Sequence, residues 1–257
     1  MKLKDIIGIE KDNLISIVGA GGKTTLIYYL GKELKKNGKV LMSTTTKIMP
    51  PKKEEADFFA IGKEEYSNIK NKQDLGSYVY SYGMNNEGKL LGIKEEEIQL
   101  IKDDFNYIIL ESDGSKCKSL KGWNDTEPVV YKETDITIGV LNIKVLEKKI
   151  TDDLIHRLEE FRKLTRGIEE DTITNKHLIR IIFNEKGLFK NSTGKRILYI
   201  NKVENPRDKD LVKSLIEDIK EENKKCRLLD KVIYGSLKEE SFNHLYWACN
   251  LKIGYNK

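Results

Sequence analysis

Short apolar runs alternate with amphipathic segments along this chain. An apolar strand that begins at Leu14 runs into a glycine-rich turn. Thr24 to Lys36 then carries apolar residues at helical spacing, and Asn37-Gly38 predicts the end of that helix. Val40 to Ser43 predicts a second strand. This order of strand, glycine-rich turn, helix and strand predicts an α/β fold built on a doubly wound, mostly parallel sheet with a P-loop NTPase-like core.

The alternation continues to the C-terminal third. Apolar runs predict strands over Phe105–Leu110, Ile136–Val140, Ile197–Ile200 and Val232–Tyr234. Amphipathic spacing predicts helices over Glu95–Lys102, Asp152–Leu164, Thr174–Phe183 and Pro206–Glu222.

Between residues 50 and 92 the pattern weakens. Phe58–Ile61, a lysine-rich helix and the alternating strand Ser77–Tyr82 predict a small excursion or hairpin there. No repeat, low-complexity tract or linker rich in Pro, Gly or Ser interrupts the chain. We therefore predict one P-loop α/β domain over residues 1–257, with a small excursion at 50–92.

The glycine-rich turn has the composition of a phosphate-binding loop. It follows the compact pattern G-x-x-G-K-T-T, as Gly19, Ala20, Gly21, Gly22, Lys23, Thr24 and Thr25. Glycines let backbone N–H groups converge on an anion, and a helix start adds unpartnered N–H groups and partial positive charge. In such loops the lysine reaches the outer phosphates and the next hydroxyl binds Mg²⁺. The alternative is a glycine turn with a solvated lysine.

The loop is two residues shorter than the standard G-x-x-x-x-G-K-[ST] pattern, which requires glycine where this chain has Ile17. In its compact form it resembles the loop of the Mur ligase group of ATPases. We expect it to bind ATP or GTP with Mg²⁺.

Two polar segments directly follow predicted strands, where ligands of open α/β sheets bind. In Thr44-Thr45-Thr46-Lys47 the hydroxyls, Thr46 among them, could bind phosphate or a magnesium-bound water, or simply end a strand. Glu111 and Asp113 are placed as a Walker-B acid is placed. With Lys23 they are the candidate catalytic residues, and Thr24 with Asp113 is the candidate magnesium site. The division of labour between the two carboxylates stays open, and the alternative is an ordinary Asp113-Gly114 turn.

A third such segment, Asn201-Lys202-Val203-Glu204, is similar to the N-K-x-D base-reading motif of GTPases. Its acid, Glu204, is one methylene longer than aspartate, which weakens the case for guanine selectivity. We treat Asn201, Lys202 and Glu204 as candidate nucleotide contacts, with a surface loop as the alternative.

Charge and cysteine usage narrow the class of protein. The 46 basic and 41 acidic residues give a net charge of +5 and are interleaved, which does not indicate a nucleic-acid partner. Cys117, Cys226 and Cys249 are far apart and favour a reducing compartment. No segment has the apolar length of a signal peptide or membrane span, so we expect a cytoplasmic protein without a membrane partner.

The histidines give no metal signal. His156 and Arg157 lie in the predicted charged helix Asp152–Leu164, where a solvated face is the favoured interpretation over an acid/base or phosphate-binding pair. His177 and His244 lack metal-ligand spacing, so we predict no zinc site.

Several segments, taken in order, resemble the YqeC family. They are IVGAGGKTT, STTTK, ILESDGSKCKSLKGW with Glu127-Pro128-Val129-Val130 after it, IGV before His156-Arg157, and LYINKVE. The resemblance implies an accessory role in maturing the cofactor of a selenium-dependent molybdenum hydroxylase. It also implies a site wall of Glu111, Asp113 and Gly114 with Lys121 and the Glu127-Pro128 turn.

We therefore expect a nucleotide hydrolase or transferase that acts on a selenium or molybdenum cofactor intermediate or on the hydroxylase itself. The alternatives are a nucleotide-gated chaperone that loads a finished cofactor, and a nucleotide sensor without hydrolysis. The sequence names neither the second substrate nor the base.

Overall fold

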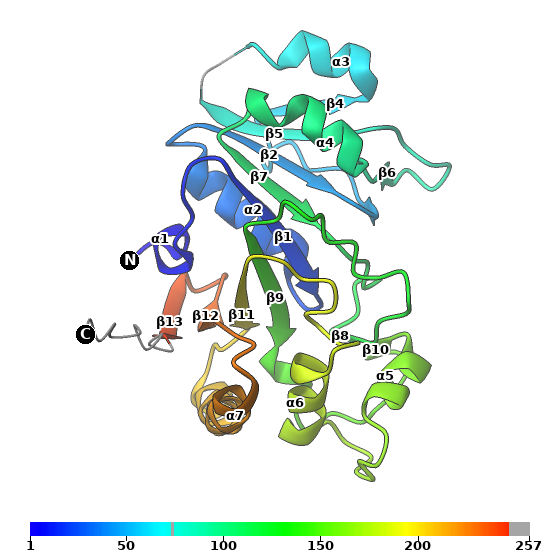
Figure 1. Ribbon diagram of the computed structural model, residues 1–257, viewed down its shortest axis with the longest axis vertical. Coiled ribbons are helices and arrows are strands. Elements are labelled where there is room, and N and C mark those ends of the chain that lie inside the picture. The colour runs from blue at the N-terminus through cyan, green and yellow to red at the C-terminus, as the bar shows by residue number, and fades with distance from the viewer. Residues whose placement is uncertain (73–74, 247–257) are drawn as a thin grey trace, which may run out of the picture.

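Figure 1 shows the computed structural model, which describes residues 1–72 and 75–246. Nine strands of the described residues form one sheet in the order β13-β12-β11-β9-β1-β7-β2-β5-β4. All neighbouring pairs run parallel except β12 and β13, which are antiparallel. The predicted doubly wound, mostly parallel α/β fold is confirmed.

The sheet strands span Asn13–Gly19 (β1), Lys39–Thr44 (β2), Phe58–Ile61 (β4), Gly76–Ser81 (β5), Tyr107–Glu111 (β7), Ile136–Asn142 (β9), Lys195–Asn201 (β11), Lys231–Ser236 (β12) and Ser241–Tyr246 (β13). Two small pairs lie outside it: Lys47–Ile48 (β3) with Leu90–Leu91 (β6), and Leu120–Lys121 (β8) with Ile155–His156 (β10).

The helices span Leu3–Ile7 (α1), Lys23–Leu34 (α2), Gly62–Ile69 (α3), Glu95–Ile101 (α4), Leu158–Leu164 (α5), Asn175–Phe183 (α6) and Pro206–Cys226 (α7). Short 3₁₀ turns cover Lys102–Asp104 and Ile143–Val145.

Helices cover both faces of the sheet because its strands are apolar on both sides. Ile15 and Ile17 of β1 face α1 and α2, in a core shared with Leu26 and Leu30. Val18, one residue on, belongs to the opposite core, which α5, α6 and α7 cover. Helices α3 and α4 cover the β4–β5 end of the sheet.

The sequence predictions differ from the structure at three places. Residues 50–92 do not form a hairpin, because β4 and β5 run parallel and extend the main sheet. The predicted helix Asp152–Leu164 begins only at Leu158, and the residues before it form β10. Strand β13 lies beyond the last strand predicted, and its mixed polar sequence is typical of an edge strand.

The chain winds away from β1 in both directions. After β1 it crosses through α2 to β2, and β7 later inserts between them, while β9 pairs on the other side of β1. The carboxyl end of β1 is thus the topological switch point, where open α/β sheets bind ligands. No helix within residues 1–72 and 75–246 has the length and apolar character needed to cross a bilayer.

Candidate nucleotide site

The turn after β1 can be made only by glycine. Gly19 has φ 100° and Gly22 has φ 140°, both in the region that side chains disfavour. A Cβ atom on Gly19 would lie 2.3 Å from the carbonyl oxygen of Val140, and one on Gly22 would lie 2.3 Å from Nδ2 of Asn201. The backbone is packed closely against β9 and β11, which fixes the shape of the loop.

The loop presents backbone donors at the start of α2. The N–H of Ala20 donates to the carbonyl of Val140 over 3.1 Å, and Nδ2 of Asn201 donates to the carbonyl of Gly21 over 3.2 Å. Within the described residues, no hydrogen-bond acceptor lies against the N–H groups of Gly21 and Gly22, and no side chain caps the helix. Such a turn is a ready anion-binding site.

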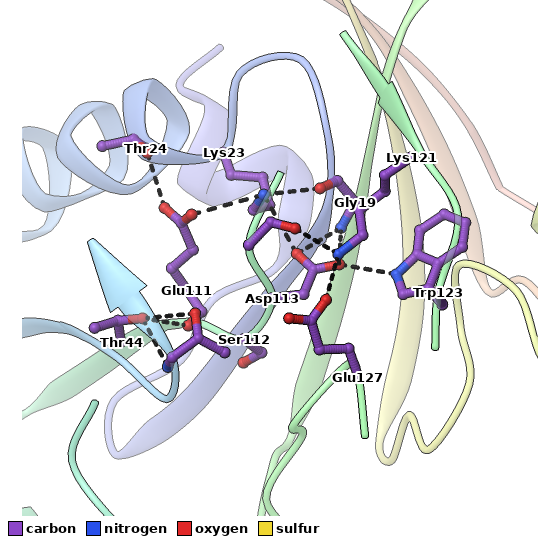
Figure 2. Close-up of polar contacts among 12 residues, drawn as sticks. Gly19, Lys23, Thr24, Thr44, Glu111, Ser112, Asp113, Lys121, Trp123 and Glu127 are labelled. Carbon is purple, nitrogen blue, oxygen red and sulfur yellow. Dashed lines mark hydrogen bonds and ion pairs between the residues drawn. The ribbon is translucent and has the colours of Figure 1, made fainter. Parts of the chain in front are cut away.

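Lys23 lies beneath this loop and is only 3% exposed. Its Nζ donates to the carbonyl of Gly19 over 2.8 Å and pairs with Asp113 at 3.3 Å and Glu111 at 3.6 Å (Figure 2). Burial on its own would lower the pKa of Lys23, but the two carboxylates outweigh it and raise this pKa. The ammonium is therefore charged, and the predicted alternative of a solvated lysine is wrong.

Asp113 holds the loop in place by its contacts with Gly19 and Lys23. It is fully buried and accepts the N–H of Gly19 at 3.0 and 3.1 Å and Nε1 of Trp123 at 2.9 Å. Lys121, also fully buried, pairs with it at 3.0 Å. Burial would raise the pKa of Asp113, yet Lys23, Lys121 and these donors lower it. Its carboxylate is occupied by protein donors and does not line the cleft described below.

Glu111, unlike Asp113, faces the cleft. Its Oε2 accepts the hydroxyl of Thr24 over 2.8 Å, and both residues line the cleft. Burial raises the pKa of Glu111, although Lys23 and Thr24 oppose this. A carboxylate that burial destabilises, beside a hydroxyl at the start of a helix, is suited to a cation that arrives with phosphate.

Charges of alternating sign extend from the loop toward β10, fully buried at Asp113 and Lys121 and partly exposed at Glu127 and Arg157. Lys121 pairs with Glu127 at 2.8 Å and donates to the carbonyl of Gly114 at 2.6 Å. Arg157 donates to both oxygens of Glu127 and shares Oε2 with Lys121. Burial would raise the pKa of Glu127, but Arg157 and Lys121 lower it. The wall that the family resemblance implies, with Lys121 and the Glu127-Pro128 turn, is thus a single ion-pair network with the loop lysine (Figure 2).

A cleft of about 1190 Å³ lies above these residues. Among the predicted residues, its lining includes Gly21, Gly22, Lys23, Thr24, Thr25, Thr46, Glu111, Asn201, Lys202 and Glu204. The N–H of Thr46 donates to Oγ1 of Thr44, which in turn donates to the backbone carbonyl of Glu111. The structure therefore brings the ends of β1, β2, β7 and β11 to one cleft.

The segment after β11 contacts the loop. Asn201 donates to Gly21 and accepts the N–H of Lys202 at 2.8 Å, so its amide holds backbone in place. Glu204 is ion-paired with Lys144 and hydrogen-bonded to Ser236 at 3.4 Å. Base recognition by Lys202 or Glu204 stays a prediction.

Sequence reasoning missed or misplaced part of the wall. His156 and Arg157 do not lie on a solvated helix, because Ile155–His156 pairs with Leu120–Lys121 and both residues line the cleft. Trp123 and Lys116 were not predicted to take part. The polar run that follows Asp113-Gly114 was the available signal, since loops after central strands face the ligand.

No group of three or more His, Cys, Asp or Glu side chains in residues 1–72 and 75–246 is arranged to hold a metal. Mg²⁺ in nucleotide sites takes most ligands from phosphate and water, so one carboxylate and one hydroxyl suffice. Cys117 and Cys226 are free and exposed, and Cys249 lies outside the described residues.

Comparison with known proteins identifies the family. The YqeC protein family model matches residues 15–159, which span β1 through the first residues of α5. The uncharacterized protein YqeC of Escherichia coli (strain K12) is 27% identical over 203 residues, covering 77% of this chain and 79% of that protein. No solved structure matches significantly. Because the family model covers more than half of the chain, this protein belongs to the YqeC family.

Proposed function

We propose that this protein binds a magnesium nucleoside triphosphate, ATP or GTP, at Gly19–Thr25 and uses it as a hydrolase or transferase. One observation carries the proposal: a glycine loop, whose Gly21 and Gly22 N–H groups have no acceptor in the described part of the chain, lies at the switch point of the sheet, over a buried charged lysine. These are the features that bind phosphate in nucleotide sites.

Each residue has a role that its contacts support. The N–H groups of Gly21 and Gly22 and the ammonium of Lys23 would bind phosphate oxygens and stabilise charge that develops on them. Thr24 and Glu111 would hold Mg²⁺, which supplies charge neutralisation on the phosphates. Asp113 was the metal candidate from sequence, but all its contacts are with protein donors, so we assign it to holding the loop and Lys23.

We further propose that the reaction assists maturation of the cofactor of a selenium-dependent molybdenum hydroxylase, as the family resemblance implies. A transferase is favoured over a switch by the size of the cleft. Single small-molecule sites occupy roughly 300–1,000 Å³, and this cleft of about 1190 Å³ has room for a second reactant.

The test is calorimetric titration of the wild type with Mg-ATP and Mg-GTP, compared with Lys23→Ala. We expect binding heat in the wild type and none in Lys23→Ala. Lys32→Ala is the matched control, because Lys32 lies on the same helix and is exposed. Equal binding heat in Lys23→Ala and Lys32→Ala would refute the site.

Measurements of phosphate release distinguish an enzyme from a chaperone and from a sensor. We expect phosphate release to be stimulated by a small-molecule cofactor intermediate in the absence of any partner protein. Stimulation only by the apo-hydroxylase would identify a chaperone instead, and binding without multiple-turnover phosphate release would identify a sensor.

A further inference from the structure

The part of the cleft away from the glycine loop is strongly basic. Eight lysine and arginine side chains line the cleft against three carboxylates, Glu111, Glu127 and Glu204. Several of the basic residues lie outside the loop: Lys116 and Lys118 lie on the turn after β7, and Arg157 follows β10. An excess of positive charge in a concave site favours an anionic ligand.

His156 is a largely buried residue of the cleft wall whose ring has no hydrogen-bond partner among the described residues. Its side chain is 8% exposed and lines the cleft, yet none of the hydrogen bonds found in residues 1–72 and 75–246 involves its ring. Strand β10 holds it in register with Lys121 of β8. No buried side-chain nitrogen or oxygen of the described residues lacks a hydrogen-bond partner, so the unpaired ring nitrogens of His156 are accessible from the cleft, where a ligand can reach them.

The charges around His156 favour the same kind of ligand. Burial, together with Arg157 and Lys121, lowers the pKa of His156 to about 4, although Glu127 opposes this. At pH 7 the ring is therefore neutral and keeps one N–H donor. The charge of Lys116 also lowers the pKa of His156, and Lys116 is exposed with no ion-pair partner in the part of the chain that the structure describes. His156, Lys116 and Arg157 thus line the same cleft, and each carries a donor group.

We propose that His156, Lys116 and Arg157 form a second subsite, which binds an oxyanion group, phosphate or carboxylate, of a small-molecule second substrate. The proposal rests on the proposed function only in calling this ligand a second substrate. The subsite is distinct from the glycine loop, because its residues come from β10 and from the turn after β7.

The two subsites are physically connected. Arg157 pairs with Glu127, Glu127 with Lys121, Lys121 with Asp113, and Asp113 with Lys23. An anion that draws Arg157 from Glu127 weakens one end of a chain whose other end is the loop lysine. The arrangement thus places the proposed oxyanion on the ion-pair network that also positions Lys23.

The test follows the imidazole resonances of the three histidines by NMR while inorganic phosphate, and separately acetate, is added. His156 is assigned by the loss of its signals in His156→Gln. We expect saturating phosphate to raise the pKa of His156 by about one unit, and Lys116→Ala to weaken this response roughly tenfold in affinity. Lys213→Ala is the control, because Lys213 is exposed on α7 outside the cleft.

The two probes distinguish the source of the oxyanion. A stronger response to phosphate supports a phosphorylated second substrate, and a stronger response to acetate supports a carboxylate. The proposal is overturned if neither probe moves His156, or if Lys116→Ala and Lys213→Ala bind alike. A nucleotide titration that fails while His156 still responds refutes the proposed nucleotide function and leaves the second subsite standing.

Discussion

The substitution Asp113→Asn tests the organisation of the site most directly. Asn keeps the shape of the side chain but removes a charge that two nearly inaccessible lysines, Lys23 and Lys121, share at 3.3 and 3.0 Å. It also brings an NH₂ group to a position surrounded by donors, the N–H of Gly19 and the indole of Trp123. Removing one partner of a buried ion pair costs about 3–5 kcal/mol, and we expect a loss in that range.

The assay is urea unfolding at pH 7, with Asp152→Asn as matched control. Asp152 also pairs with a lysine, Lys118, but its side chain is 78% exposed. Exposed pairs contribute about 0–1 kcal/mol, so the control should change the free energy of unfolding little. A loss in Asp113→Asn no larger than in Asp152→Asn would refute the claim that this carboxylate holds the loop together.

The same variant makes a pH prediction whose sign follows from the lowered pKa of Asp113. A carboxylate with a depressed pKa in the folded state stabilises the protein above its unfolded pKa of about 3.9. That contribution is lost as the pH falls through the folded value. The difference between wild type and Asp113→Asn should therefore shrink on acidification below about pH 4. A difference that grows there contradicts the assignment.

Three further outcomes are expected. Burial raises the pKa of Glu111, so folding favours its protonated form. Glu111→Gln should therefore raise the melting temperature at pH 7 and have little effect on it below about pH 4.5, while it weakens Mg²⁺-dependent nucleotide binding. A lower melting temperature of the variant at pH 7 contradicts this. Gly22→Ala should abolish nucleotide binding in calorimetry, because its Cβ would meet Asn201, whereas Gly88→Ala, with positive φ but open space, should bind normally. Native His156, with a pKa of about 4, resists protonation, so the wild type should lose stability as the pH falls from 6.5 to 4. His156→Gln should show a smaller drop in melting temperature over this range, and an undiminished drop argues against the burial of His156.

The strand, glycine turn and helix that begin the site were predictable because their signals are local. The apolar run, the order of Gly19 to Thr25 and the spacing of Leu26, Ile27 and Leu30 fall within 17 consecutive residues. The positions of Glu111 and Asp113 at the end of a central strand were predictable for the same reason, because β7 is short, apolar and buried.

The roles of the two carboxylates were not predictable, because they depend on distant residues. Asp113 is ion-paired with Lys121 and accepts a hydrogen bond from Trp123, while Glu111 accepts one from Thr24, 87 positions away. His156 was assigned to a helix because helical spacing and charge dominate its neighbourhood. The two-residue pairing of β10 with β8, which buries it, has no periodicity to detect.

The clamp from Asn201 to the carbonyl of Gly21 joins residues 180 positions apart. Gly21 lies within residues 15–159, the part that matches the family model, and Asn201 lies outside it. When only the first two-thirds of the chain has been synthesised, every glycine of the loop is therefore present, but the Asn201 amide that holds the loop is not. During synthesis the glycine loop would therefore acquire its final geometry late, after β11 has docked beside β9, and if it binds nucleotide as proposed, it would do so only from then on.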